Sequence, residues 1–282
     1  MKIKIAFLLS LLGVLFGTAL RCVQMLFFFD YDTGFVTDSG AFTWAYCGVT
    51  LTVGIACMVL CRLDKGLFGT MQRGRSWGCG FSGLAVSLFL LFGAFVLFKD
   101  TYTFFEFGVS YSIEPGHIGV HIPFAALSAL FGIASMAVSV LWLKGGKMPG
   151  VPGVMWAVGV VWGLYYMILT FFTYSPSATT QENLYTVGGG ALMLMFLLAE
   201  GKLLSGTGGR KAARQVYIFG LPAVVFWLTY FFSNTVLVFC GHGYAAEMPF
   251  VIQLMMFALS VHAVTLLKDL QDDELFVPSL KS

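Results

Sequence analysis

Eight apolar stretches, each about as long as the roughly 20 residues needed to cross a bilayer, dominate this chain. Only 11% of the residues are charged, less than half of the roughly 25% typical of soluble domains. The pattern predicts an all-α integral membrane bundle of eight transmembrane helices, with no room left for a soluble catalytic domain. The predicted spans are about 5–29, 42–61, 78–98, 121–143, 151–173, 184–204, 216–239 and 249–267.

The basic residues predict how these spans are oriented. All but two of the sixteen Lys and Arg residues lie at a terminus or in every second connection. Because Lys and Arg are retained on the cytoplasmic side, we expect both termini to be cytoplasmic and the protein to lie in the cell membrane. The spans then form four hairpins closed on the outer side. The outer connections hold the acids Asp30, Asp32, Asp38, Asp100, Glu106, Glu114, Glu182 and Glu247.

We expect one transmembrane domain over residues 1–268 and a short cytoplasmic tail over 269–282. Residues 54–58 match 132–136 at an offset of 78, and the same offset carries Arg21 onto Lys99. Repeated hairpins are frequent in transporters, so the matches indicate an internal duplication. The four hairpins are about 5–61, 78–143, 151–204 and 216–267.

Arg21 and Lys99 are candidate pathway residues, because a charge inside a span is costly and indicates function by default. Arg21 lies roughly 25 Å along a core of about 30 Å. We therefore interpret both side chains as anchors that reach the outer headgroups. The alternative is a buried pair of Arg21 with Asp30, Asp100 or a bound anion. Gln24 lies one turn above Arg21 and is placed to hydrogen-bond with it.

Glu200, near the inner end of the sixth span, and His262, in the eighth span, are further candidate pathway residues. We expect Glu200 at the headgroup level beside Lys202, and His262 as a hydrogen-bonded packing residue. No second titratable group is expected at the bilayer midplane, which argues against a pump driven by a buried acid.

Four residues of the outer connections predict a metal site: Glu114, His117, His121 and His242. Two imidazoles with a carboxylate or a third imidazole can hold Zn²⁺ or Cu²⁺. Solvated loop histidines are the competing interpretation, because the Pro and Gly residues around His117 disfavour a regular helix there.

Glycine pairs indicate where helices approach closely. Gly13 and Gly17, like Gly159 and Gly163, form G-x-x-x-G motifs that let helix backbones meet in lipid. The contact is either within the bundle or with a membrane-protein partner or second copy. The bilayer is the expected main partner, and nothing indicates nucleic acid.

The segment Phe29-Asp30-Tyr31-Asp32-Thr33-Gly34-Phe35 follows the span that carries Arg21. It resembles the start of uncharacterised multi-spanning membrane proteins from bacteria. The resemblance implies a bacterial membrane protein and brings no activity, cofactor or partner with it.

Three functions remain open. The first is a transporter-like conduit for a small solute, indicated by the repeats and the absence of a soluble domain. The second is a non-catalytic membrane subunit or scaffold, indicated by the scarcity of buried polar groups. The third is a membrane enzyme that uses the outer His and Glu residues; it is the least favoured, because P-loop, H-E-x-x-H and G-x-S-x-G motifs are missing.

Overall fold

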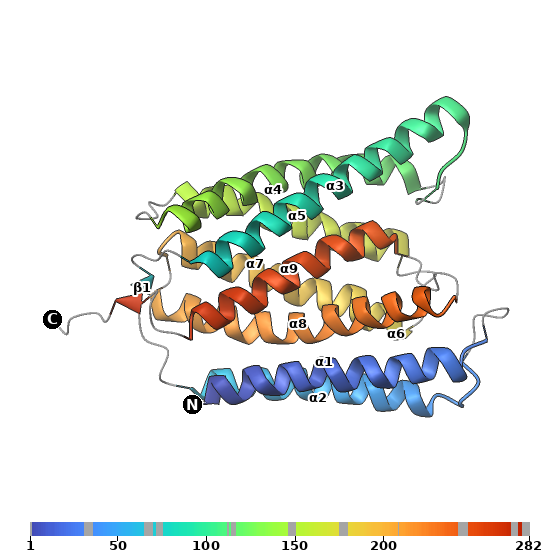
Figure 1. The fold of residues 1–282 in the computed structure, drawn as a ribbon, viewed down its shortest axis with the longest axis horizontal. Coiled ribbons are helices and arrows are strands. Elements are labelled where there is room, and N and C mark those ends of the chain that lie inside the picture. Colours follow the sequence, from blue (N-terminus) through green and yellow to red (C-terminus); the bar gives the residue numbers. More distant parts are fainter. Residues whose placement is uncertain are drawn as a thin grey trace.

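The computed structural model of the chain describes residues 2–30, 36–64, 70–71, 76–111, 113, 117–145, 151–174, 180–207, 209–241, 248–271 and 276–277. In these residues it is almost entirely helical (Figure 1). The helices are α1 (Lys2–Phe27), α2 (Ala41–Leu63), α3 (Trp77–Phe107), α4 (Ile118–Lys144), α5 (Val151–Leu169), α6 (Thr180–Asn183), α7 (Gly189–Leu204), α8 (Gly209–Phe239) and α9 (Phe250–Asp269).

Eight helices are long and apolar enough to cross a membrane, which confirms the predicted number of spans. Helix α3 continues to residue 107 rather than 98, and Gly108 ends it with a positive φ of 69° that favours glycine. Two spans contain π-helical turns at their ends away from the chain termini. These are η2 (Thr170–Tyr174), which continues α5, and η3 (Leu184–Gly188), which leads into α7.

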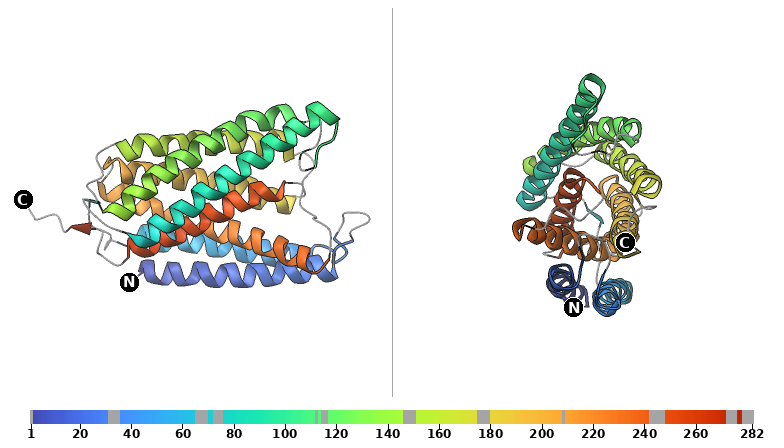
Figure 2. Two further views of the ribbon diagram at one scale, coloured as in Figure 1. Left: turned by 45° about the horizontal axis from the view of Figure 1, so that its top comes forward. Right: turned by 90° about the vertical axis from the view of Figure 1, so that its right-hand side faces the viewer.

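Six of the spans form a closed ring. Helix α8 contacts α9, α9 contacts α3, and the contacts continue through α4, α5 and α7 back to α8. The hairpin of α1 and α2 packs outside this ring against α8, as the end-on view shows (Figure 2). Helix α8 is therefore covered on both sides. In the most apolar 18-residue segment of α8, 83% of the residues are buried, against 33% in the corresponding segments of α1 and of α2.

The four motif glycines make contacts within the chain. Gly13 faces Val53 of α2, and Gly17 faces Thr229 of α8, so closely that a Cβ on either glycine would collide or press on its neighbour. Gly159 faces Phe131 in the same way, and Gly163 faces Leu194. The glycines therefore serve contacts within the bundle, the first of the two alternatives, and a contact with a partner or a second copy through them stays a prediction.

The start of α1 and the last described residues, near the C-terminus, lie at the same end of the bundle, which we call the terminal end (Figure 1). There the short strands β1 (Thr70–Met71) and β2 (Phe276–Val277) pair antiparallel, with Thr70 opposite Val277. Residues near Arg21 and Gly108 lie at the opposite end, which we call the far end.

Candidate functional site

Arg21 is enclosed by three tyrosines. Its guanidinium carbon lies 5.0 Å from the ring centre of Tyr230, 5.2 Å from that of Tyr185 and 6.0 Å from that of Tyr46. Each tyrosine comes from a different element: α8, η3 and α2, respectively. At these distances a cation is attracted to the ring face. We call these four residues, together with Glu182, the Arg21 cage.

The interpretation of Arg21 as a headgroup anchor is wrong. Its side chain is only 2% exposed, and its Nη2 lies 3.8 Å from Glu182 Oε1. The depth along the span allowed snorkelling, but α1 turns Arg21 toward α8 and not toward lipid. Neither proposed acid is this partner: Asp100 instead accepts hydrogen bonds from Ser110 and from the backbone N–H groups of Tyr111 and Ile113.

Lys99 has a different environment from Arg21, because it is exposed on α3. The expectation that the two side chains would lie in equivalent surroundings is therefore wrong. The duplication itself stays a prediction.

Buried hydrogen-bond donors in the Arg21 cage and beside it are unused. Arg21 Nη2 donates to Asn234 Oδ1 at 3.4 Å, the outer limit of a hydrogen bond, and Arg21 Nε has no partner among the described residues. The indole Nε1 of Trp227, whose ring lies 5.9 Å from that of Tyr230, is also buried without a partner in that part of the chain. Such groups are costly to bury unpaired, and both are donors, as an anionic ligand requires.

A polar chain connects Arg21 to α9. Asn234 donates from Nδ2 to Gln253 Oε1 at 3.1 Å, and Gln253 Nε2 donates to the carbonyl of Met248 at 3.1 Å. Gln24 is also buried, but its amide donates to Thr43 at 2.6 Å and not toward Arg21. The cage is thus held by α1, α2, α8, α9 and the η3 region together.

A second buried polar site lies toward the terminal end. His262 Nε2 is 2.9 Å from Glu200 Oε1, and the two side chains are each 1% exposed. His262 Nδ1 lies 3.0 Å from Ser82 Oγ, which lies 2.7 Å from Thr265 Oγ1. The expectation that Glu200 sits at the headgroups beside Lys202 is wrong: Glu200 points into the ring, where α7 faces α9. His262 is hydrogen-bonded, as expected, but to an acid.

Glu200 has one unused oxygen. Its Oε2 is buried and has no hydrogen-bond partner in the described part of the chain. The ring of Trp156 lies 5.7 Å from that of His262. The indole Nε1 of Trp156 is also buried, and it has no hydrogen-bond partner among the described residues. A titratable pair that includes an acid is therefore buried inside the ring, toward the terminal end, and the expectation that no second titratable group lies at the bilayer midplane stays a prediction.

An unbroken series of aromatic rings joins the two sites, and we call it the aromatic string. Successive ring centres are 5.4–6.0 Å apart, the spacing of favourable ring pairs. All of its rings are at most 1% exposed. From the Arg21 cage to His262, the string runs through Tyr230, Trp227, Tyr166, Trp162, Phe131 and Trp156.

The predicted metal site is only partly described. Glu114 and His242 lie outside the described residues. His121 is buried, with Nδ1 2.8 Å from the carbonyl of His117 and Nε2 2.6 Å from the hydroxyl of Tyr174. No group of three metal-ligating side chains occurs among the described residues. A zinc or copper site that includes Glu114 and His242 stays a prediction.

Sequence reasoning misses most members of both sites. It places Glu182 only in an outer connection, and it does not single out Asn234 and Gln253. A signal is present, because amide side chains within apolar spans are uncommon and usually face the bundle interior. The tyrosines give no such signal, since aromatic residues are also expected at any membrane interface.

Comparisons of the chain with protein-family models, with curated proteins and with solved structures find no match. The function has therefore to be argued from the residues themselves.

Proposed function

We propose that this polytopic membrane protein is a carrier for a small anionic solute, and that the Arg21 cage binds the anion. The observation that carries the proposal is the buried guanidinium, whose Nε has no partner among the described residues and whose ion pair with Glu182 is loose. A charge-assisted N–H···O bond is about 2.7–2.9 Å long, so the 3.8 Å separation from Glu182 leaves Arg21 open to a better partner.

A carboxylate or phosphate is the ligand that this geometry favours. Arginine presents a planar fork of donors that matches two oxygens of such a group. The incoming anion would replace Glu182 as the partner of Arg21 and take up the free Nε. The neighbouring tyrosine faces keep the guanidinium in place when Glu182 moves away.

The Glu200–His262 pair is the second polar position along the proposed transport path, after the Arg21 cage. It lies on the other side of the aromatic string, and α9 carries both His262 and Gln253 of the Arg21 polar chain. Gln253 and His262 are nine positions apart in α9, which corresponds to about 13 Å along the helix. Passage of the anion from the Arg21 cage to the Glu200–His262 pair requires the rings of the aromatic string to move. The π-helical turns η2 and η3 beside the cage are sites where helices can shift register.

Ligand-induced stabilisation tests the proposed site. Acetate, succinate, citrate and inorganic phosphate would each be added to the purified protein in detergent, and the melting temperature measured. A ligand at 100 times its Kd stabilises by about 2.7 kcal/mol, so we expect at least one of these anions to raise Tm by about 5–10 °C. The same anion should then enter proteoliposomes that contain the protein.

Two variants make the binding test specific. Arg21→Lys keeps the charge but loses the fork, and it should weaken binding of the anion by about tenfold or more. Lys99→Gln, which removes an exposed cation near the same end of the bundle, should bind as the wild type does. If both variants respond alike, or if none of the four anions shifts the wild-type Tm, the carrier proposal fails.

A non-catalytic membrane subunit is the second candidate, and the aromatic string favours it. A core of interlocked rings gives a rigid bundle and does not by itself provide a water-filled path. This candidate predicts that a membrane protein co-purifies at fixed stoichiometry in mild detergent, and that none of the anions binds.

We also propose that the terminal end faces the cytoplasm, because the described Lys and Arg residues other than Arg21 and Lys99 gather there. Single cysteines at exposed positions test this in a variant whose exposed Cys240 and half-buried Cys22 and Cys47 are replaced by Ala. Ser39→Cys and Tyr111→Cys at the far end should react with an impermeant thiol reagent on intact cells. Lys144→Cys and Thr207→Cys should react only after lysis. Opposite labelling at both positions of either pair would show that the proposed orientation is inverted.

A further inference from the structure

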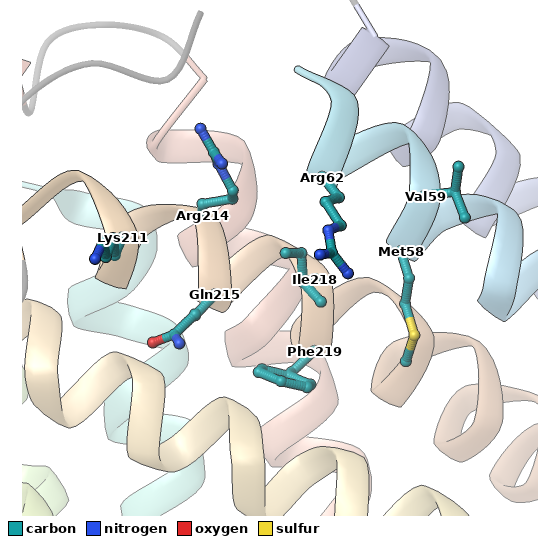
Figure 3. A pocket seen from close by; sticks show the side chains of 8 residues that line it. All are labelled: Met58, Val59, Arg62, Lys211, Arg214, Gln215, Ile218 and Phe219. Carbon is teal, nitrogen blue, oxygen red and sulfur yellow. The ribbon is translucent and has the colours of Figure 1, made fainter. Parts of the chain in front are cut away.

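A groove with a basic rim lies between α2 and α8 near the terminal end. Its volume is about 500 Å³, and it opens on the outside of the bundle. Figure 3 shows Arg62 and Met58 of α2 facing Ile218 and Phe219 of α8 across it. The eight residues that line it are Met58, Val59, Arg62, Lys211, Arg214, Gln215, Ile218 and Phe219.

The charges of the groove gather at one level. Arg62 lies in the last turn of α2, and Lys211 and Arg214 lie in the first two turns of α8. The lining residues include three cations and no acid. Arg214 Nε is buried without a hydrogen-bond partner among the described residues, so one donor in this lining is unused.

The rest of the groove is apolar and extends along the spans. Met58 and Val59 lie one turn deeper in α2 than Arg62, and Ile218 and Phe219 lie one turn deeper in α8 than Arg214. Cations at the headgroup level above apolar side chains at the acyl-chain level match the two parts of a lipid. Basic pockets between transmembrane helices bind anionic lipid headgroups in this way.

We propose that this groove binds one anionic phospholipid of the leaflet at the terminal end. Its phosphate would lie among Arg62, Lys211 and Arg214, and one acyl chain would lie against Met58, Ile218 and Phe219. A lipid held there contacts both α2 and α8, and would join the α1–α2 hairpin to the ring. This inference is independent of the proposed carrier function, because the groove shares no residue with either buried site.

Native mass spectrometry of the detergent-solubilised protein tests the groove. Titration with phosphatidylglycerol should show one tightly bound molecule, and phosphatidylcholine should bind much more weakly. The triple variant Arg62→Gln, Lys211→Gln, Arg214→Gln should bind phosphatidylglycerol about a hundredfold more weakly, because each cation near an anionic headgroup contributes about a factor of five. Met58→Trp, which fills the apolar part and keeps every charge, should also reduce binding.

A matched variant separates a site from general surface charge. Lys2→Gln, Lys4→Gln, Lys144→Gln also removes three cations at the same end but none from the groove, and it should bind phosphatidylglycerol as the wild type does. Equal losses in the two triple variants would overturn the proposal. It would also be overturned if the two lipids bound equally well, or if inorganic phosphate at the same concentration displaced phosphatidylglycerol, since the acyl chain would then play no part.

Discussion

Arg21→Leu is expected to lower the free energy of unfolding by about 3–5 kcal/mol, because it removes one charge of a buried ion pair and leaves the other charge buried without this cation. Glu182 would lose its cation, and three tyrosine rings would lose a cation–π contact. For a chain of this length, that loss corresponds to a fall in Tm of roughly 10 °C or more. Thermal unfolding of the purified variant in mild detergent measures it.

Lys99→Leu is the matched control for this prediction. It also removes a basic residue near the far end of a span, but from an exposed position, so its effect should stay within about 0.5 kcal/mol. The double variant Arg21→Leu, Glu182→Gln should be more stable than the sum of the two single changes, because both charges of the ion pair are then removed together. Equal melting temperatures for Arg21→Leu and Lys99→Leu would restore the interpretation of Arg21 as a headgroup anchor.

The number of spans could be predicted because it depends only on local apolar length. Each apolar stretch of about 20 residues has few other ways to satisfy its backbone in lipid. Helix α3 extends beyond its apolar part because Lys99 and Asp100 do not stop a helix. A length argument therefore finds the apolar core of each span better than the end of the helix.

The sequence also indicates which way the Arg21 side chain points. The indication comes from the spacing of its neighbours in α1 and not from its depth in the span. Ser10, Gly13, Gly17 and Gln24 lie at helical spacing on the same buried face as Arg21. A stripe of small and polar residues marks the face of a membrane helix that meets another helix. Arg21 belongs to this stripe, so the spacing of these residues argues against snorkelling even though the depth of Arg21 permits it.

The partners in both sites could not be predicted, because they depend on which helices become neighbours. Arg21 and Asn234 are separated by most of the chain, as are Ser82 and His262. The ring order, with α9 between α8 and α3, follows from packing over the whole bundle and from no local pattern. The expected position of Glu200 is wrong for this reason: its place near the end of a span does not reveal the histidine of α9 that faces it.

Glu200→Leu is expected to have an effect comparable with that of Arg21→Leu. The change removes the 2.9 Å contact with His262 and leaves the imidazole buried with an unused nitrogen, inside the ring rather than at its surface. Breaking such a pair costs about 3–5 kcal/mol if it is charged, and about 1–3 kcal/mol if only a neutral hydrogen bond is lost. Glu200→Gln keeps an oxygen and a nitrogen within reach of His262. A loss of stability close to that of Glu200→Leu would therefore indicate a charged pair, and a smaller loss would indicate a neutral hydrogen bond.

The exposed acid Glu106 of α3 supplies the control, since Glu106→Leu should change stability by no more than about 0.5 kcal/mol. The double variant Glu200→Leu, His262→Leu adds a sharper comparison. Replacing both members of a buried polar pair by apolar residues is often nearly neutral, whereas removing one is not. The double variant should thus be more stable than Glu200→Leu alone. If the double variant is instead less stable than Glu200→Leu, by as much as a second independent substitution would cost, the two residues do not act as a pair. The proposed role of the Glu200–His262 pair in the transport path would then lose its support.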